Sequence, residues 1–362
     1  MQAAQPRRAY QTLDGLRGVG AFLVVMRHVP YFFGPISVPE SFLAVDLFYL
    51  VSGFVVAHAY AERLKGGGYF TAFVKTRIIR LYPLYALGLA LGVIPALISI
   101  FFDPVGWWTW GKVALALATG AVMFPMLPGM GANGSSLDGP TWTLAPELVA
   151  NALYALFIRW MTLPVLIAII AVSGAGVIYA EHHYESLDVG YGDTELWAAL
   201  ARVGFSFFTG VLIHRFFGAR EHRSNLISWG LVAVLGVLLG ITVSDDWVND
   251  YELAVVLLGF PLLLIGAACF EPGPRTGKLF SVVGLVSYGV YIIHQPLGNI
   301  ARQVIKRVPA LNDPTGIVSG TLFMAAVIAL AWWLDGAFDA PVRKVLRGWF
   351  LSGPGKAKQT SV

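Results

Sequence analysis

The stretch QTLDGLRGVGAFLVVMRHVPYFF, residues 11–33, combines the length of a membrane span with several ionisable side chains. A helix needs about 20 mostly apolar residues to cross a bilayer, so this stretch is long enough. On a helix with 100° per residue, Asp14, Arg17 and His28 lie on one face, and about 16 Å separates Arg17 from His28 along the axis. Because ionisable groups are costly in lipid, we expect this face to line the interior of a helix bundle, with the imidazole deep inside.

The composition of the 362-residue chain indicates a protein with many membrane spans. Its residues are 57% hydrophobic and 13% charged, and its mean hydropathy is +0.68, whereas a soluble domain has about 25% charged residues. The first apolar stretch is too long and too charged for a cleavable signal peptide, and a second span follows it at once.

The single cysteine and the charge distribution exclude several classes of site. One cysteine, Cys269, permits neither an intrachain disulfide nor a metal cage built from cysteines. The net charge of +4 is gathered in short basic loops, which is typical of membrane topology rather than of nucleic-acid binding. We expect no metal site and no nucleic-acid partner.

Apolar stretches recur along the whole chain, and several of the loops between them are basic. Basic loops mark the cytoplasmic side of a membrane. The apolar stretches fall near 13–33, 41–61, 81–102, 109–127, 141–158, 163–181, 195–217, 227–244, 251–270, 279–298 and 317–337.

The number of crossings follows from a parity argument. Five apolar stretches separate the basic loop 62–80 from the basic loop 215–223, and two loops on one side require an even number of crossings. The stretch 109–127 is therefore predicted to be re-entrant or interfacial. The sequence predicts an all-α membrane protein, a bundle of about ten transmembrane helices plus this segment. Both termini are then cytoplasmic, and residues 128–140 and 182–194 lie outside.

We expect a single membrane domain over residues 1–345, followed by a short basic cytoplasmic tail at 346–362. Within the second span, Asp46 lies in the outer half, where an unpaired carboxylate would be costly. Ser52 and Gly53 lie at mid-span, where a glycine lets a ligand or another backbone approach closely. Plain helix packing explains Ser52 and Gly53 equally well.

Residues 69–83, YFTAFVKTRIIRLYP, form a basic amphipathic stretch. Arg77 and Arg80 are three residues apart and share a helix face, and Pro83 is a start signal for a helix over 81–102. The pair could bind phosphate groups at the cytoplasmic mouth of the bundle, since guanidinium groups bind phosphate through two parallel hydrogen bonds. Ordinary anchoring by positive charge is the alternative.

Two further polar side chains fall near the outer face. Glu147 follows Pro146 one turn into a helix, where a carboxylate either stabilises the helix dipole or is a partner for an imidazole. His294 belongs to SYGVYIIHQPL, residues 287–297, and could instead be an interfacial histidine satisfied by the backbone. His28 lies about 22 Å from the inner end of its helix, so His28, Asp46, Glu147 and His294 all fall in the outer half.

Taken together in this order, several motifs resemble the acyltransferase 3 family of polytopic membrane acyltransferases. The resemblance runs from about residue 10 to residue 345. The motifs are LDGLRG at 13–18 with His28 following, VDLFYLVSGF at 45–54, RIIRLYP at 77–83, WTLAPE at 142–147, RVGFSFFTGVLIHRF at 202–216 and SYGVYIIHQPL at 287–297.

The resemblance implies ten membrane helices, a cytoplasmic acyl-CoA donor and transfer of an acetyl or other short acyl group to a hydroxyl, often on an exported glycan. By position, the family's essential histidine is His28, and its arginine pair is Arg77 and Arg80. The chain departs from the family pattern at Asp339, where a glutamate is expected before Ala-Pro, so no role is assigned to Asp339. We expect no fused esterase-like domain, which several members have.

We therefore expect an O-acyltransferase of the cytoplasmic membrane. The expected co-substrate is acyl-CoA, with acetyl-CoA as the first choice, and no permanently bound cofactor is expected. The expected partners are a glycan or lipid-linked hydroxyl acceptor and membrane lipids. His28 would be the general base, with Glu147 or Asp46 holding its tautomer, although an acyl-histidine intermediate is equally open. The expected substrate-binding residues are Arg17, Ser52, Gly53, Arg77, Arg80, Tyr288 and His294.

Two other functions fit part of the pattern. A proton-coupled transporter could use His28, Asp46 and Glu147 as a proton relay, but such a relay does not need the basic stretch before Pro83. A structural membrane protein is the third possibility, and the ionisable groups in the first two spans argue against it.

Overall fold

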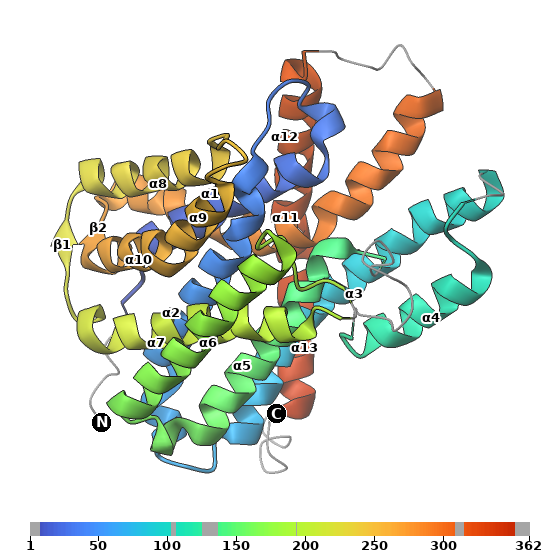
Figure 1. The fold of residues 1–362 in the computed structure, drawn as a ribbon. Coiled ribbons are helices and arrows are strands. Elements are labelled where there is room, and N and C mark those ends of the chain that lie inside the picture. The colour runs from blue at the N-terminus through green and yellow to red at the C-terminus, as the bar shows by residue number, and fades with distance from the viewer. Residues whose placement is uncertain (1–7, 103–105, 125–136, 193, 308–314, 352–362) are drawn as a thin grey trace.

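The computed structural model describes residues 8–102, 106–124, 137–192, 194–307 and 315–351, which form a fan of long helices (Figure 1). The described strands are two short segments, β1 (His222–Arg223) and β2 (Phe270–Glu271), which pair in parallel. The helices before β1 are α1 (Gln11–His28), α2 (Ala44–Lys65), α3 (Phe70–Phe102), α4 (Trp110–Ala121), α5 (Leu144–Phe157), α6 (Leu163–Tyr184) and α7 (Leu196–Phe217), with short 3-10 turns η1 (Pro30–Phe32), η2 (Pro39–Leu43), η3 (Gly139–Thr143) and η4 (Ile158–Trp160).

The helices after β1 include two that contain a turn of π-helix. The two single helices are α8 (Asn225–Gly240) and α11 (Pro274–Arg307). One continuous helical rod consists of α9 (Val248–Ala254), the π-helical η5 (Val255–Gly259) and α10 (Phe260–Cys269). The other consists of α12 (Ile317–Leu334), the π-helical η7 (Asp335–Asp339) and α13 (Ala340–Phe350).

The chain is an all-α membrane protein. Eight helices in the described part of the chain are long and apolar enough to cross a bilayer. Two more connect the same two ends of the bundle: α1, which carries the ionisable face, and α8, an apolar helix of 16 residues. Together they agree with the predicted number of crossings. The 12-residue α4 is about 18 Å long, too short to cross, and it packs beside α3 (Figure 1), as expected for an interfacial or re-entrant segment.

One predicted boundary is wrong. Pro83 does not start a helix but lies inside α3, which runs without a break from Phe70 to Phe102. A proline inside a helix removes one backbone hydrogen bond. Ending the helix inside a bilayer would leave several backbone groups unsatisfied, which costs more. The basic stretch is thus the first part of the span itself.

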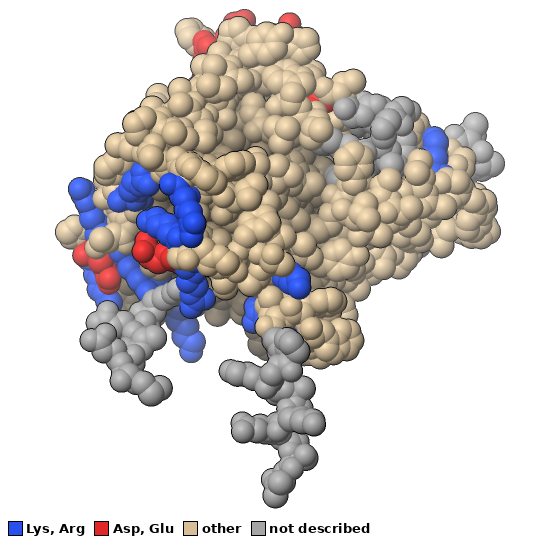
Figure 2. Space-filling model, turned by 90° about the horizontal axis from the view of Figure 1, so that it is seen from below, with Lys and Arg blue, Asp and Glu red and all other residues tan. Residues whose placement is uncertain are grey.

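The loops gather at two ends of the bundle, and we call the end at which α1 begins the proximal end. The Arg159 side chain donates a hydrogen bond to the carbonyl of Lys65 (3.2 Å), and Arg215 donates to that of Met161 (3.0 Å). The two basic loops therefore share the proximal end, as the parity argument requires. In Figure 2, Lys and Arg gather on one part of the face seen from below, and the rest of that face is nearly uncharged.

The distal end holds the turn after α1 and the start of α12. The hydroxyl of Ser319 donates a hydrogen bond to the carbonyl of Phe32 (2.7 Å), which joins these two segments. Residues 128–136, most of the loop 128–140 that is predicted to lie outside, fall beyond the described part of the chain, as do residues 352–362 of the predicted basic tail. The predicted boundary between residues 345 and 346 falls within α13.

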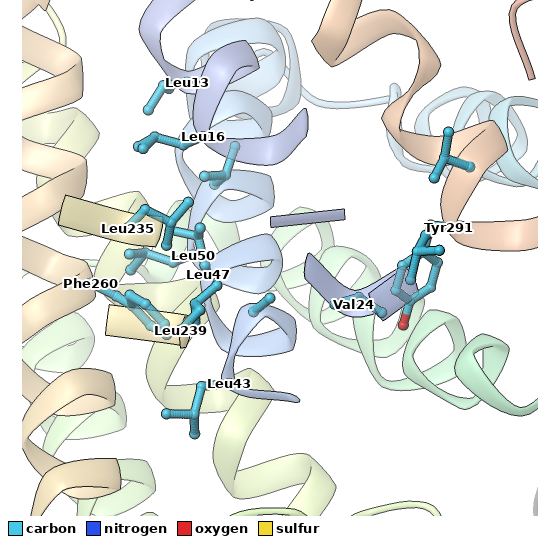
Figure 3. Close-up of a cluster of buried hydrophobic side chains, with 14 of the residues drawn as sticks. Leu13, Leu16, Val24, Leu43, Leu47, Leu50, Leu235, Leu239, Phe260 and Tyr291 are labelled. Carbon is cyan, nitrogen blue, oxygen red and sulfur yellow. The ribbon is translucent and has the colours of Figure 1, made fainter. Parts of the chain in front are cut away.

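The core beside the site is aliphatic and tightly packed. Figure 3 shows Leu47 and Leu50 of α2 close to Leu235 and Leu239 of α8 and to Phe260 of α10, all of them buried. Against the other side of α1, α11 approaches closely because α1 has glycines at the contact. A Cβ at Gly18 would lie 2.0 Å from Cγ1 of Val283. This packing brings the polar face of α1 against α11 and fixes what lies beside His28.

Candidate active site

A cationic cavity opens in the proximal half of the bundle. Its volume is about 120 Å³, and three arginines line it: Arg17 of α1 and both Arg77 and Arg80 of α3. The two arginines of α3 reach the same cavity because residues three apart lie on one side of a helix. The remaining polar lining consists of Ser52, Thr143, Glu147, Ser287 and three tyrosines, Tyr49, Tyr288 and Tyr291.

The three arginines differ in how their charge is compensated. Arg77 is buried, and its Nη2 donates hydrogen bonds to Oε1 of Glu147 (2.7 Å) and to Oγ of Ser52 (3.3 Å). Ser52 in turn donates to the same carboxylate oxygen (2.6 Å). Arg80 is exposed and makes no ion pair with any described residue. Arg17 lies 3.4 Å from Asp14. The cavity therefore offers net positive charge, chiefly from Arg80.

A larger polar cavity opens in the distal half. Its volume is about 710 Å³, and His28, at the end of α1, borders it. Most of its other polar lining consists of arginines, aromatic rings and amides: Arg27, Tyr31, Trp142, Tyr191, Arg202, Gln295, Asn299 and Arg302. Burial raises the pKa of Tyr31 and Tyr191, so both hydroxyls stay protonated and can donate hydrogen bonds to a ligand.

The loop that follows α6 closes one side of the distal cavity. The carboxylate of Glu252 accepts a hydrogen bond from the backbone N–H of Leu187 (2.5 Å), which holds the loop against α9. The next residue, Asp188, forms an ion pair with Arg27 of α1 (2.5 Å). Further along, Glu195 accepts hydrogen bonds from two backbone N–H groups of the loop. Acidic side chains thus fix the loop beside His28.

His28 is paired with a second histidine, His294 of α11. Nε2 of His294 lies 3.1 Å from Nδ1 of His28. Each ring also has Nδ1 3.0 Å from a carbonyl oxygen four residues earlier in its own helix, that of Val24 for His28 and that of Val290 for His294. A carbonyl oxygen only accepts, so each Nδ1 carries the proton. Nε2 of His28 is then the unprotonated nitrogen, and it makes no hydrogen bond within the described residues.

The two cavities are separated by a thin wall. Val45 of α2 and Tyr291 of α11 are the described residues that line both cavities. The hydroxyl of Tyr291 donates a hydrogen bond to the carbonyl of Pro140 (2.8 Å) and lies 3.0 Å from Oγ1 of Thr143. The ring is therefore held across the gap between the cationic cavity and His28.

Neither carboxylate predicted to hold the tautomer of His28 does so. Glu147 is paired with Arg77 in the proximal cavity. Asp46 is paired with Arg202 of α7 (2.5 Å), and both side chains are 1% exposed. The physical reason is electrostatic. A guanidinium paired with a carboxylate offsets the cost of removing that carboxylate from water, whereas a neutral imidazole would leave this cost uncompensated. The backbone and His294 hold His28 instead.

Most of the other predicted binding residues line a cavity, whereas one of them serves helix packing. Arg17, Ser52, Arg77, Arg80 and Tyr288 all line the proximal cavity. Gly53 does not. A Cβ at Gly53 would lie 1.9 Å from the carbonyl oxygen of Phe207, so this glycine lets α2 and α7 touch along their backbones. For Gly53, the packing alternative is the one that the structure supports.

His294 is fully buried and stands behind His28 rather than on a cavity wall. The structure shows it as a hydrogen-bond partner of His28. In the described part of the chain, no group of three or more His, Cys, Asp or Glu side chains could hold a metal ion. Asp339, to which no role was assigned, is buried in the π-helical turn η7 and paired with Arg343 (3.0 Å).

Sequence reasoning missed two residues of the site. Arg202 is an arginine inside an apolar span, so the argument that singled out Asp46 should also have singled out Arg202 as its counter-charge. Tyr291 lies inside the quoted motif SYGVYIIHQPL, but nothing in the sequence shows that its hydroxyl reaches Pro140 in another segment.

Comparisons with known proteins identify the family of the chain. Residues 10–336 match the Acyl_transf_3 family, described as an acyltransferase domain. "Protein 2 in picA locus" of Rhizobium radiobacter is 39% identical over 195 residues, which is 50% of this chain and 98% of that protein. "Putative membrane-bound transacylase BcsY" of Komagataeibacter xylinus is 25% identical over 376 residues, 95% of this chain and 88% of that protein. No solved structure matches the chain. The chain is a helical membrane bundle with a half-buried histidine, His28, beside its distal cavity, and the family model covers nearly its whole length. It belongs to the acyltransferase 3 family and is a multi-pass membrane O-acyltransferase-type enzyme.

Proposed function

We propose that the protein moves an acetyl or other short acyl group from cytoplasmic acyl-CoA to a hydroxyl of a glycan or lipid-linked acceptor on the far side of the membrane. The membrane is the cytoplasmic membrane, and the proximal end of the bundle faces the cytoplasm. The gathering of basic loops at the proximal end supports this orientation, because loops rich in Lys and Arg are retained on the cytoplasmic side.

The proximal cavity suits the donor. Acyl-CoA carries phosphate groups at one end and the thioester at the other, joined by a narrow pantetheine arm. Arg80 and Arg17 would bind the phosphates at the mouth of the cavity, since charge-assisted hydrogen bonds to phosphate are among the strongest in proteins. Tyr288 and Tyr291 line the same cavity from neighbouring positions on α11, and the arm would extend along them.

The distal cavity suits a carbohydrate-like acceptor. Trp142 and Tyr191 offer flat aromatic faces, and Gln295 and Asn299 offer groups that both donate and accept hydrogen bonds. Such a lining binds a ligand with many hydroxyl groups. A lipid-linked sugar has the same hydroxyl chemistry, and the bilayer would hold its lipid portion beside the bundle.

His28 carries out the chemistry in this proposal. Its unprotonated Nε2 accepts the proton of the acceptor hydroxyl as the oxygen attacks the thioester carbonyl carbon. The tetrahedral intermediate then breaks its C–S bond, and the departing sulfur takes the proton from His28, giving the ester and free CoA. Attack by Nε2 of His28 itself, through an acyl-histidine, uses the same geometry and leads to the same products.

The transporter alternative loses its proposed relay. Its two carboxylates, Asp46 and Glu147, are held in ion pairs with Arg202 and Arg77 and make no contact with His28. A relay through them would need both pairs to open. The single observation that carries the acyltransferase proposal is the placement of His28 at one cavity, with an arginine-lined cavity directly behind the wall formed by Val45 and Tyr291.

The test uses purified protein in liposomes with acetyl-CoA that is radiolabelled in the acetyl group. Label should transfer to an added glycan or lipid-linked sugar with the wild type, and His28→Ala should abolish transfer while acetyl-CoA binding persists. His183→Ala is the matched control, because this histidine lines neither cavity. Transfer by His28→Ala at the wild-type rate would overturn the mechanism. Release of CoA without any acceptor would favour the acyl-histidine route.

The orientation is tested separately. Single cysteines replace Glu62 at the proximal end or Asp246 at the distal end, in a Cys269→Ser background, and both positions are exposed. A membrane-impermeant maleimide should label Asp246→Cys and not Glu62→Cys on intact cells, and inside-out membrane vesicles should show the reverse pattern. Labelling of both from one face would contradict the transmembrane arrangement.

A further inference from the structure

We propose that His294 is the positioning residue for His28, because it accepts the Nδ1–H of His28 and so keeps Nε2 as the nitrogen that takes up the proton. This inference rests on the proposed function, since it concerns the step that His28 carries out. His294 lines neither cavity and is 0% exposed, so it acts through His28 and not through the substrate.

The hydrogen bonds form a chain with a fixed direction. At its far end, the carbonyl of Val290 can only accept, so Nδ1 of His294 donates to it (3.0 Å) and Nε2 of His294 is left as an acceptor. That acceptor lies 3.1 Å from Nδ1 of His28, which also lies 3.0 Å from the carbonyl of Val24. Nδ1 of His28 is thus surrounded by two hydrogen-bond acceptors, Nε2 of His294 and the carbonyl of Val24. Both contacts are hydrogen bonds only if Nδ1 of His28 carries the proton.

The same chain favours the protonated form of His28 during the reaction. When Nε2 takes up the acceptor's proton, positive charge spreads over the ring, and the Nδ1–H becomes a stronger donor. Its hydrogen bond to His294 then becomes charge-assisted, and such bonds are roughly twice as strong as neutral ones. His294 therefore stabilises the state that forms in the transition state more than the resting state, which should appear in kcat rather than in KM.

Two substitutions of His294 separate its two hydrogen bonds. In His294→Gln, the side-chain oxygen comes near the place of Nε2, so the acceptor for His28 is kept while the bond to Val290 is lost. In His294→Asn, the amide comes near the place of Nδ1, so the bond to Val290 is kept while the acceptor for His28 is lost. Both variants have similar polarity, so each is the matched control for the other.

We expect His294→Asn to lower kcat about 10- to 100-fold, or about 1.4–2.7 kcal/mol at 1.36 kcal/mol per decade. His294→Gln should retain most of the wild-type kcat, and KM for both substrates should stay within about threefold in both variants. Acetyl-CoA binding confirms that each variant is folded. In selectively ¹⁵N-labelled wild type, the resonances that His28→Ala removes should show a protonated Nδ1 and an unprotonated Nε2.

The outcomes distinguish this inference from the proposed function. If His28→Ala keeps its activity, the proposed mechanism fails, and this inference fails with it. If His28→Ala is inactive but the Asn and Gln variants of His294 have equal kcat values, whether normal or reduced, the function stands and the positioning role is overturned. A ¹⁵N spectrum with an unprotonated Nδ1 on His28 would overturn it as well.

Discussion

Arg80 should bind the phosphates of acyl-CoA more directly than Arg77 does. Arg80 is exposed in the proximal cavity and has no ion pair within the described residues, whereas the charge of Arg77 is already compensated by Glu147. A hydrogen bond to a charged group contributes about 1.5–3 kcal/mol. Because the partial solvation of Arg80 weakens its interaction, we take the lower end of this range, which is about a tenfold loss of affinity in Arg80→Ala.

The assay is equilibrium binding of acetyl-CoA to purified protein at two salt concentrations, since exposed charge interactions weaken as salt rises. Arg80→Lys should recover only part of the affinity, because lysine lacks the planar fork of the guanidinium group. Lys75→Ala is the matched control, as Lys75 is exposed on the same helix and lines neither cavity. A comparison with 3′-dephospho-CoA shows which phosphate Arg80 contacts.

Arg77→Ala should behave differently, because it leaves the carboxylate of Glu147 without its cation. We expect a lower melting temperature in Arg77→Ala and an unchanged one in Arg80→Ala. The reasoning is refuted if Arg80→Ala binds acetyl-CoA as tightly as the wild type and Lys75→Ala do. In that case Arg80 serves only as a positive-charge anchor at the membrane surface.

The remaining predictions concern stability. Breaking a buried ion pair costs about 3–5 kcal/mol, so Asp46→Asn should lower the melting temperature strongly, and joint replacement of Asp46 by Leu and Arg202 by Met should recover much of the loss; an unchanged Asp46→Asn would contradict a structural pair. Gly53→Ala should be destabilising, whereas Gly236→Ala, with open space around its Cβ, should not; equal effects would argue against close contact of α2 and α7. Burial raises the pKa of Glu271 to about 7. Between the ordinary pKa of a glutamate and pH 7, the folded protein therefore holds a proton that the unfolded chain has lost, so stability should fall as the pH rises through this range. Glu271→Gln should flatten this dependence of the melting temperature on pH, and a wild-type slope in that variant would refute the assignment.

The polar face of α1 could be predicted from the sequence because it depends only on the geometry of one helix. Arg17 and Ala21 border the proximal cavity, and His28 borders the distal one, which is the order that their spacing requires. The crossing count could also be predicted, because loop charge and parity are properties of the chain alone.

The partner of His28 could not be predicted because depth in the membrane gives one coordinate only. Asp46, Glu147 and His294 were all expected in the outer half, and nothing in the sequence says which of their helices packs beside His28. The glycines of α1 let α11 approach closely, which brings His294 to the imidazole. Asp46 faces α7 instead, where Arg202 compensates its charge.

The wall formed by Val45 and Tyr291 also has an electrical consequence for the cell. Polar cavities reach this wall from both ends of the bundle, so the membrane potential falls mainly across a short distance rather than across the full bilayer. Moving one elementary charge through 100 mV is worth about 2.3 kcal/mol. In an energised membrane, the aromatic ring, held by its hydroxyl to Pro140, would thus insulate against proton leakage. In the proposed reaction, a proton that passes between His28 and a leaving group at this wall would move within that steep field.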